Sequence, residues 1–400
     1  MTRPPLHRVP RLAGALVLAA VAVACGGTPS PAPTATPHST PTAPATATPT
    51  APTASATATT TASPCAVGPQ TPPQGTIAAS YATALAFAPD GRLFWTERTG
   101  TVKVWQDGGA HDFASVATVT TEANGNYSER GLLGIAIGPG FATDRYVYAF
   151  YSDTNRTQQH VIRWRDCKGV SSEAQVIVTL PAGNDCCHKG GRLGFGSDGM
   201  LYVTLGEEHS SQLAQDTGDV RGKILRYRPD GSVPTDNPFG AANPVWAYGF
   251  RNPFGIAFSA TGQMAVTSNG PSGDAGSPTT GYDELYAAVR RGTGYQWPDC
   301  YGYSHPLATA SCPAGQPEPD WSSETGTVVP TGVSFVDASG PSAYAGHIVF
   351  CTFTAGMKIF TAGTPHGSVA GGPSTCRLDV KQGPDHALYW SDTAHIYRGA

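Results

Sequence analysis

Several short segments of this chain place side chains suited to acid–base and electrostatic chemistry directly ahead of an apolar run. Among them, His188 precedes the run 192–196, Glu129 and Arg130 precede 132–138, and Arg251 precedes 255–259. An imidazole takes up and releases protons near neutral pH, and a guanidinium group stabilises negative charge that develops beside it. If the fold brings these segments together, they form a site for proton transfer coupled to charge stabilisation.

The apolar runs behind these residues have the length and the turns of β-hairpins. Asp198-Gly199 separates 192–196 from 201–205, and this pair tolerates the positive φ angles of a tight hairpin turn. The same order of first strand, turn and second strand recurs six times between residues 65 and 400. We expect first strands at 84–88, 132–138, 192–196, 255–259, 332–336 and 378–382, second strands at 93–96, 146–151, 201–205, 264–268, 347–352 and 388–391, and third strands at 101–105, 160–165, 223–227, 284–288, 356–360 and 395–398.

Six antiparallel repeats of this kind predict an all-β fold, a six-bladed β-propeller of four-stranded blades. A β-sandwich or two smaller β domains are the alternatives, but no linker interrupts the series after residue 65. The sixth repeat has only three strands of its own, and we expect 76–80 to supply the fourth and remove an exposed edge.

In a propeller the first strand of each blade lines the central channel. The segments ahead of the first strands, and the loops after the second strands, therefore meet at one mouth, where they would gather an imidazole, guanidinium groups, an amide and carboxylates. Each of these residues also has an ordinary explanation. A lone loop histidine is more often structural, and an arginine such as Arg251 can simply pair with a blade carboxylate.

The first 64 residues read as a targeting and tether region. Residues 1–24 combine a basic start with a short apolar run, which predicts a bacterial lipoprotein signal peptide with Cys25 as the lipidated residue. Ordinary secretion is the alternative. Residues 25–64 are rich in Thr, Pro and Ala and predict a disordered linker. We therefore expect an exported protein, held on the extracytoplasmic side of the membrane by a lipid anchor alone, with the propeller at 65–400.

The cysteine count agrees with export. Nine cysteines less Cys25 leave an even number, which is typical of disulfides in an exported domain. Pairing by proximity favours Cys300 with Cys312 and Cys351 with Cys376, and Cys65 with Cys167 would then fix the start of the domain. Cys186 and Cys187 either bridge each other as a vicinal disulfide or pair elsewhere.

Composition excludes two classes of partner and cofactor. The net charge is −4 and no basic patch stands out, so a nucleic-acid partner is not expected. No strand–GxGxxG–helix unit is present, which argues against a dinucleotide-binding oxidoreductase.

The motifs ERGLLGIAIGPGF (129–141), HKGGRLGFGSDGMLYVTLGE (188–207), RGKILRYRPDGSVPTDNPF (221–239), VWAYGFRNPFGIAF (245–258) and GYQWPDCYG (294–302), taken in this order, resemble the glucose/sorbosone dehydrogenase family. The family consists of soluble aldose dehydrogenases dependent on pyrroloquinoline quinone (PQQ) and calcium. The resemblance implies oxidation of an aldose sugar at C1 to a lactone, with electrons passed to a quinone or cytochrome acceptor.

The resemblance also implies roles for individual residues. His188 matches the general base, Arg251 and Asn252 match the contacts to the quinone carbonyls, and the backbone carbonyls of Gly270 and Pro271 match a calcium site. Arg130 and Arg377 are further candidates for cofactor binding. By analogy with larger quinoproteins, a Cys186–Cys187 disulfide would form a stacking surface.

Two departures from the family pattern keep another function open. The family has a lysine in the fifth unit and a pair of arginines before the sixth inner strand, which bind the carboxylates of PQQ. Here Lys358 is displaced by several residues and only Arg377 remains of the pair. The alternative is a catalytically inactive propeller that binds a carbohydrate or a protein at the cell surface.

Overall fold

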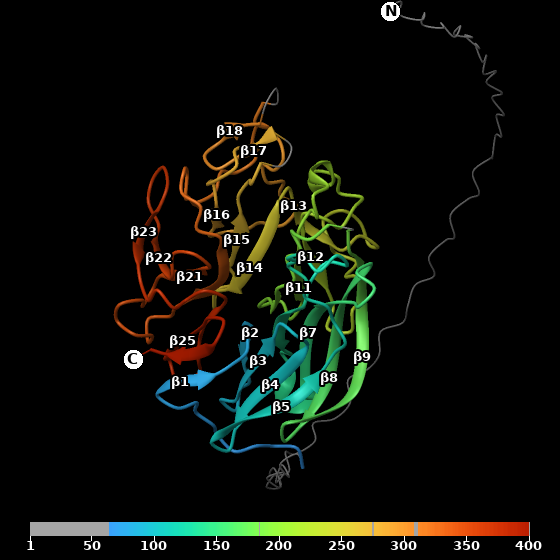
Figure 1. The fold of residues 1–400 in the computed structure, drawn as a ribbon, viewed down its shortest axis with the longest axis vertical. Helices are drawn as coiled ribbons and strands as arrows, with labels where there is room; N and C mark the ends of the chain where they lie inside the picture. Colours follow the sequence, from blue (N-terminus) through green and yellow to red (C-terminus); the bar gives the residue numbers. More distant parts are fainter. Residues whose placement is uncertain (1–63, 184, 274–275, 308–310, 400) are drawn as a thin grey trace, which may run out of the picture. The chain divides into compact units, whose positions relative to one another are not determined.

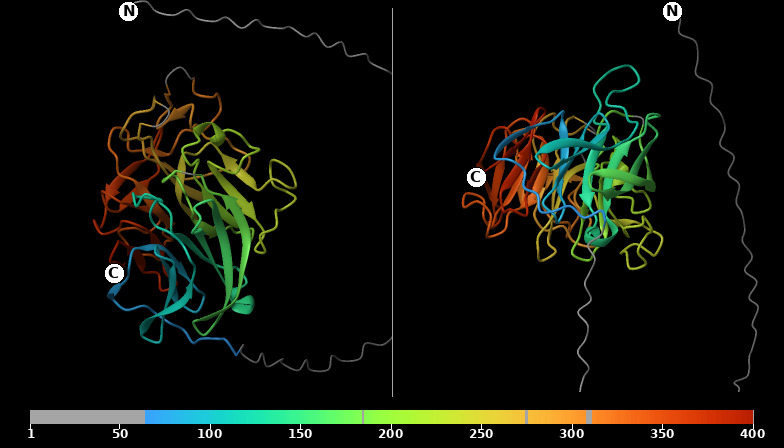
Figure 2. Two further views of the ribbon diagram at one scale, coloured as in Figure 1. Left: turned by 45° about the vertical axis from the view of Figure 1, so that its right-hand side comes forward. Right: turned by 90° about the horizontal axis from the view of Figure 1, so that it is seen from below.

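The computed structural model describes residues 64–183, 185–273, 276–307 and 311–399. Six four-stranded antiparallel sheets follow one another around a central channel, so the predicted six-bladed β-propeller is confirmed (Figures 1 and 2). The predicted signal peptide, Cys25 and nearly all of the predicted linker lie outside the described residues. Across the described ranges, no helix has the length and apolar character needed to cross a bilayer.

Within each blade the first strand lies at the channel and the others follow outward. Blades one and two contain β2 (Ala82–Phe87), β3 (Leu93–Glu97), β4 (Thr101–Gln106) and β5 (Gly109–Ser115), then β6 (Leu132–Ile137), β7 (Tyr146–Ser152), β8 (Gln158–Cys167) and β9 (Val170–Pro181). Blades three and four contain β10 (Leu193–Phe195), β11 (Leu201–Leu205), β12 (Lys223–Tyr227) and β13 (Val245–Tyr248), then β14 (Asn252–Phe258), β15 (Met264–Asn269), β16 (Glu284–Tyr286) and β19 (Trp321–Ser322).

Blade five contains β20 (Pro330–Phe335), β21 (Ile348–Thr352), β22 (Lys358–Thr361) and β23 (Ser368–Gly371), and blade six contains β24 (Val380–Gln382), β25 (Leu388–Ser391), β26 (His395–Arg398) and β1 (Gly75–Ala78). A small hairpin of β17 (Cys300–Tyr301) and β18 (His305–Pro306), a short α1 (Phe141–Asp144) and a 3₁₀ turn η1 (Ser211–Ala214) lie in the connections.

The first and last blades share a sheet, as predicted. The early strand β1 pairs antiparallel with β26, from Gly75 opposite Arg398 to Ala78 opposite His395. The ring is therefore closed by backbone hydrogen bonds between segments more than 300 residues apart, which leaves no free edge between blades six and one.

Strands that are buried on both faces, such as β6 and β11, explain why the sheets pack face to face. In blades two and three, Leu133, Phe150 and Val203 belong to one buried apolar cluster that both sheets contribute to. The inner strands approach so closely that glycine is required at some positions. A Cβ atom on Gly134 would lie 2.2 Å from the carbonyl oxygen of Gly191, and any side chain there would push blades two and three apart.

Three inner strands begin earlier than expected. β2 starts at Ala82 instead of residue 84, β14 at Asn252 instead of residue 255, and β20 at Pro330 instead of residue 332. In all three the pairing register shifts near the start, which is the signature of a β-bulge. The bulge adds a residue to the strand, so Asn252 lies at the strand end and not in the loop before it.

The eight cysteines of the propeller form four disulfides. The pairs Cys300–Cys312 and Cys351–Cys376 confirm the pairing predicted from proximity, and Cys65–Cys167 confirms the pair expected to fix the start of the domain. Cys186 and Cys187 bridge each other, with their Cα atoms 3.7 Å apart, which settles the open choice in favour of the vicinal disulfide.

Candidate active site

The loops at one end of blades two, three and four surround a cavity of about 240 Å³. Five of the residues predicted to act at the mouth line this cavity, namely His188, Arg251, Asn252, Gly270 and Pro271. The remaining lining residues are Glu129, Cys187, His209, Asn269, Ser272, Thr279, Asp283, Thr327 and Val329. The blade register therefore brings together residues that lie far apart in the sequence.

His188 is held in one orientation by a buried carboxylate. Its ring is almost fully buried, and its Nδ1 atom contacts Oε1 of Glu207, whose side chain is completely buried. Glu207 lies in the loop after β11, and its backbone N–H donates to the carbonyl of Arg251 at 2.9 Å. A carboxylate at Nδ1 fixes the tautomer in which Nε2 has a lone pair, which is the form that can accept a proton.

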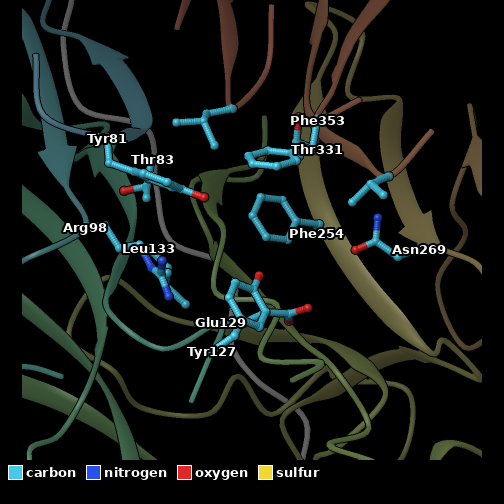
Figure 3. Close-up of a pocket in the computed structure, with 12 residues that line it drawn as sticks. Tyr81, Thr83, Arg98, Tyr127, Glu129, Leu133, Phe254, Asn269, Thr331 and Phe353 are labelled. Carbon is cyan, nitrogen blue, oxygen red and sulfur yellow. The ribbon is translucent and has the colours of Figure 1, made fainter. Parts of the chain in front are cut away.

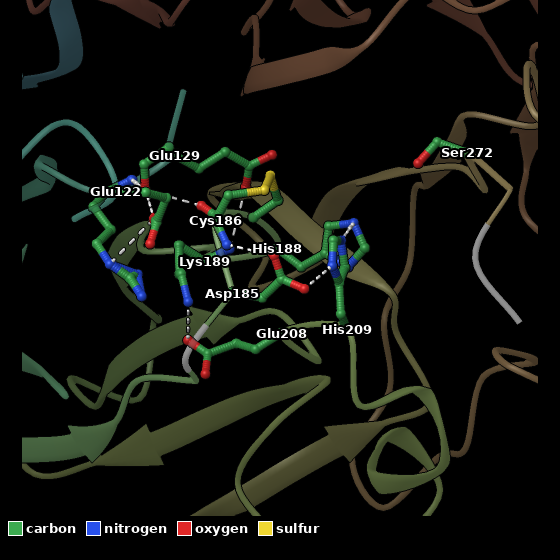
Figure 4. Close-up of a disulfide and its surroundings, with 12 residues drawn as sticks. Glu122, Glu129, Asp185, Cys186, His188, Lys189, Glu208, His209 and Ser272 are labelled. Atoms are coloured by element: carbon green, nitrogen blue, oxygen red, sulfur yellow. Dashed lines mark hydrogen bonds and ion pairs between the residues drawn. A yellow bond between two sulfur atoms is a disulfide. The ribbon is translucent and has the colours of Figure 1, made fainter. Parts of the chain in front are cut away.

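A second imidazole faces the first. His209 places its Nε2 atom 3.2 Å from Nε2 of His188, and the two rings meet edge to face with centroids 4.1 Å apart (Figure 4). On its other side, Nδ1 of His209 lies 2.6 Å from Oδ2 of Asp185. Sequence reasoning placed His209 at the mouth but gave it no role, because nothing in the local pattern reveals which ring faces which.

Asn252 joins the loops of three blades. Its Oδ1 atom accepts the backbone N–H of Gly190 at 3.1 Å, and its Nδ2 donates to Oε2 of Glu129 at 3.2 Å and to Oδ1 of Asn269 at 3.1 Å. Glu129 in turn accepts the N–H of Lys189 at 3.2 Å. Every polar atom of this amide is used, so Asn252 sets the relative position of the loops that surround the cavity.

Arg251 provides the positive charge of the cavity. Its guanidinium donates to Oγ of Ser272 at 2.7 Å and to the carbonyl of Asn269 at 3.4 Å, and it lies over the ring of Trp297 at 5.7 Å. The side chain is 4% exposed. A cation at this depth interacts strongly with any anionic group that enters the cavity, because little water screens it.

The Gly270-Pro271 loop is fixed by a buried aspartate. Oδ1 of Asp283 accepts the N–H of Gly270 at 2.9 Å, and Oδ2 accepts the N–H groups of Val328 and Val329 at 2.7 and 2.9 Å. Burial raises the pKa of Asp283 even though these three N–H groups act to lower it. Among the residues that the structure describes, no three His, Cys, Asp or Glu side chains gather as a metal-binding cluster.

The vicinal disulfide forms part of the same wall. Cys187 lines the cavity. The carbonyl of Cys186 accepts hydrogen bonds from the N–H of Glu129 at 2.8 Å and from the hydroxyl of Ser128 at 3.0 Å. The disulfide therefore links the loop that carries His188 to the loop ahead of β6 (Figure 4).

Two further cations stabilise this loop from behind. Nζ of Lys189 lies 3.1 Å from Oε1 of Glu208, and burial lowers the pKa of Lys189 and raises that of Glu208. Arg130, predicted as a cofactor contact, is fully buried and donates to the carbonyl of Gly183 at 2.8 Å, with Glu122 3.6 Å away. Arg130 does not line the cavity, and its partners are those of a residue that holds the loop in place.

A second cavity of about 210 Å³ adjoins the first, and the two share Glu129, Asn269 and Val329. Its walls are largely aromatic, as Figure 3 shows, and the remaining lining residues are Tyr81, Thr83, Arg98, Tyr127, Leu133, Phe254, Thr331, Phe353 and Leu378. Sequence reasoning missed Tyr81 and Phe353. The signal was available, because Tyr81 lies directly ahead of an inner strand, as Arg251 does, and Phe353 directly follows a second strand, as Gly270 does.

The last predicted cofactor contact, Arg377, points elsewhere. Its side chain is exposed, and neither cavity is lined by it or by Lys358. Its backbone carbonyl accepts a hydrogen bond from the hydroxyl of Thr331 at 3.0 Å. The main chain of Arg377 therefore reaches the mouth, while its guanidinium group lines neither cavity.

Comparison with known proteins places this site in a family. The chain is 31% identical over 254 residues to aldose sugar dehydrogenase YliI from Escherichia coli and 29% identical over 256 residues to quinoprotein glucose dehydrogenase B from Acinetobacter calcoaceticus. These alignments cover 59% and 55% of this chain but only 65% and 50% of the two relatives.

The structure resembles that of an oxidoreductase from Thermus thermophilus described as a glucose dehydrogenase. The TM-score is 0.68 at 28% identity, and the match covers 81% of this chain and 99% of the other. The profile of the Glucose / Sorbosone dehydrogenase family matches residues 79–395, which is the propeller from the end of β1 into β26. The chain therefore belongs to the glucose/sorbosone dehydrogenase family.

Proposed function

We propose that this protein oxidises aldose sugars at C1 to lactones, with PQQ as the electron acceptor in the site and a quinone or cytochrome as the final acceptor. The observation that carries the proposal is the arrangement around His188. A buried carboxylate holds its Nδ1, and the ring faces a cavity that also contains Arg251 and Asn252. The similarity to an aldose sugar dehydrogenase and to a quinoprotein glucose dehydrogenase supports the same function.

The cavities suit a flat, aromatic and anionic cofactor. The rings of Tyr81, Phe254 and Phe353 offer surfaces against which a planar ring system can stack, and Arg251 and Arg98 are the guanidinium groups among the lining residues. Arg98 is already engaged by backbone carbonyls, including those of Arg130 and Thr120 at 3.0 Å. PQQ fits these residues, but with few cations for its three carboxylates we expect micromolar binding.

Calcium fits the Gly270-Pro271 loop. Calcium prefers oxygen ligands in flexible geometry, and the backbone carbonyls of a loop held in place by Asp283 can meet that preference. Asp283 uses both oxygens on backbone N–H groups, so it holds the loop instead of binding the ion directly. Gly270 and Pro271 would hold calcium through their carbonyls, and the ion would help to neutralise the cofactor's negative charge.

PQQ held by Arg251 and Asn252 would supply a two-electron acceptor for the hydride from C1 of the sugar. Nε2 of His188 takes the proton from the C1 hydroxyl, and Glu207 stabilises the imidazolium that forms. Arg251 stabilises negative charge on the reduced cofactor, since it is buried and close to the cavity. Asn252 keeps the loops of His188 and Glu129 at a fixed separation.

One observation favours a second function. Lys358 and Arg377, expected as cofactor anchors, line neither cavity, so this chain could have lost PQQ and kept the mouth as a carbohydrate- or protein-binding surface. The rings of Tyr81 and Tyr127 suit sugar binding without chemistry.

We propose further that the protein is exported and anchored by a lipid on Cys25. The four disulfides of the propeller support an oxidising compartment. A Cys25→Ala variant should lose radiolabelled palmitate and leave the membrane fraction. Palmitate labelling that persists in the variant would exclude this anchor.

The function is tested by loading the full chain with PQQ and calcium and adding a panel of aldoses. Absorbance of the cofactor reports binding, and reduction of an artificial dye reports turnover. Saturable binding with sugar-dependent dye reduction is the expected result. Sugar or protein binding without any uptake of PQQ would favour the second function.

A further inference from the structure

His209 stands between the site and the surface. It lines the cavity of His188, and it also lines an open surface pocket of about 520 Å³ together with Asp185. Exposure of the side chains rises in order along this row, from 0% for Glu207 and 4% for His188 to 32% for His209 and 51% for Asp185. Polar atoms thus run without a gap from the buried carboxylate to solvent. Figure 4 shows the part of this row from His188 through His209 to Asp185.

The protons along this row can be counted. Nδ1 of each ring faces a carboxylate, Glu207 for His188 and Asp185 for His209, so each Nδ1 donates. A neutral imidazole has one N–H, which leaves a lone pair on both Nε2 atoms. Two lone pairs 3.2 Å apart repel each other, whereas a proton between them makes a hydrogen bond. Once His188 has taken a proton, the geometry therefore places an acceptor for it, Nε2 of His209, within hydrogen-bond distance.

We propose that His209 takes the proton that His188 removes from the substrate and, with Asp185, delivers it to solvent. This inference rests on the proposed function, in which His188 is the base. The Nε2–H bond of His188 breaks and an Nε2–H bond forms on His209, whose imidazolium is stabilised by Asp185 at Nδ1. The same Nε2–H bond of His209 then breaks and the proton passes to water in the surface pocket, which restores the lone pair on His209. No electrons move in this step, and His188 regains its lone pair.

Asp185 stabilises the protonated form of His209. Burial acts to raise the pKa of Asp185, but hydrogen bonds from His209 and the N–H of Cys186 outweigh burial, and the pKa is lowered. Asp185 is therefore ionised near neutral pH, and its negative charge at Nδ1 favours the imidazolium of His209.

The other charged groups near His209 are already engaged. Glu208 binds Lys189 at 3.1 Å and Gln159 at 2.7 Å, and Arg221, across the surface pocket, binds Asp219 at 2.7 Å. The row Glu207–His188–His209–Asp185 is thus the connection from this cavity to solvent that the described residues provide.

The relay is tested with His209→Gln in the full chain loaded with PQQ and calcium, at low buffer concentration. We expect kcat to fall roughly 10- to 100-fold, with KM nearly unchanged. This loss is no larger than the effect usually found when a group that transfers a proton directly is removed. Added imidazole should restore the rate, because it replaces the missing ring in solution. The control is His366→Gln, which removes a histidine of similar exposure 2.9 Å from Glu318 and should change nothing. A wild-type rate, or a loss that imidazole does not restore, would overturn the relay.

A second measurement does not depend on turnover. Nitrogen-15 NMR of the histidines in the unloaded chain should show His188 and His209 titrating as a coupled pair, with Asp185→Asn and His209→Gln both shifting the titration of His188. Independent titration of the two rings overturns the relay. If the wild type oxidises no aldose, the proposed function fails, and the NMR result still decides whether the two rings share a proton.

Discussion

Blades two to four and blades five and six line the same mouth but bring different chemistry to it. The first group contributes Glu129, His188, Arg251 and Asp283, all charged or able to become charged. The second contributes Thr327, Val329, Thr331, Phe353 and Leu378, and none of these lining residues is charged. The molecule therefore has a reactive half and an apolar half, and the fold by itself gave no reason for this division.

The difference has a consequence for the cofactor. A planar anionic group would meet its cations and its base on one side and stacking surfaces on the other. The reactive half then sets the orientation of the cofactor through charged and hydrogen-bonding groups. The apolar half contributes stacking contacts that constrain the orientation much less.

The largest expected effect is loss of the base in the reactive half. His188→Asn should lower kcat by about 10²- to 10⁴-fold, because proton removal from the C1 hydroxyl is no longer assisted. Dye reduction measures the loss, and cofactor absorbance checks that the variant still loads PQQ. A fully loaded variant with near wild-type turnover would remove His188 from the mechanism.

The second prediction compares an arginine from each half. Arg251→Gln should weaken PQQ binding by about 10- to 100-fold, the usual range for a lost hydrogen bond to a charged group. Arg377→Gln should have almost no effect, because that side chain is exposed and lines neither cavity. Fluorescence titration gives both affinities, and the reverse order would show that blade six anchors the cofactor.

The reactive half also contains a buried carboxylate whose titration opposes folding. Burial raises the pKa of Glu284 from its ordinary value of 4.5 to about 8. Between these two pH values the folded state therefore holds a proton that the unfolded state has lost. The contribution of Glu284 to the free energy of unfolding is greatest below pH 4.5, and it falls as pH rises towards 8, by at most about 1.4 kcal/mol per pH unit. Denaturant unfolding should show Glu284→Gln to be more stable than wild type at pH 8.

Glu173→Gln is the matched control, since that side chain is 61% exposed and should leave the pH profile unchanged. A Glu284→Gln variant that keeps the wild-type decline between pH 5 and 8 would assign the decline to another group.

The smallest effect comes from adding a charge to the apolar half. Phe353→Lys should tighten PQQ binding by up to about fivefold, which corresponds to a partly exposed ion pair of at most ~1 kcal/mol. Phe353→Met is the control for loss of the ring. Equal weakening in both variants would mean that stacking on Phe353 matters more than charge.

The strands could be predicted because their signals are local. Apolar runs and turns such as Asp198-Gly199 fixed six repeats, and the missing strand of the sixth repeat identified the region of β1. Bulges in β2, β14 and β20 moved three strand starts, since a bulge depends on pairing that no single segment reveals.

The site could be predicted only in part. His188, Arg251, Gly270 and Pro271 line the cavity because residues ahead of inner strands and after second strands share one end of the blades. The sequence could not predict that Glu207 contacts His188 or that the side chain of Arg377 is exposed. A shift of one residue in strand register turns a side chain to the opposite face of the sheet, and the register is not visible in the sequence.

The central claim is tested most directly by a crystal structure of the chain soaked with PQQ and calcium. The account predicts density for the cofactor between the two halves, with its quinone oxygens near Arg251 and Asn252 and calcium on the carbonyls of Gly270 and Pro271. Clear density for PQQ elsewhere, or cofactor carboxylates on Arg377 without contact to Arg251, would contradict it.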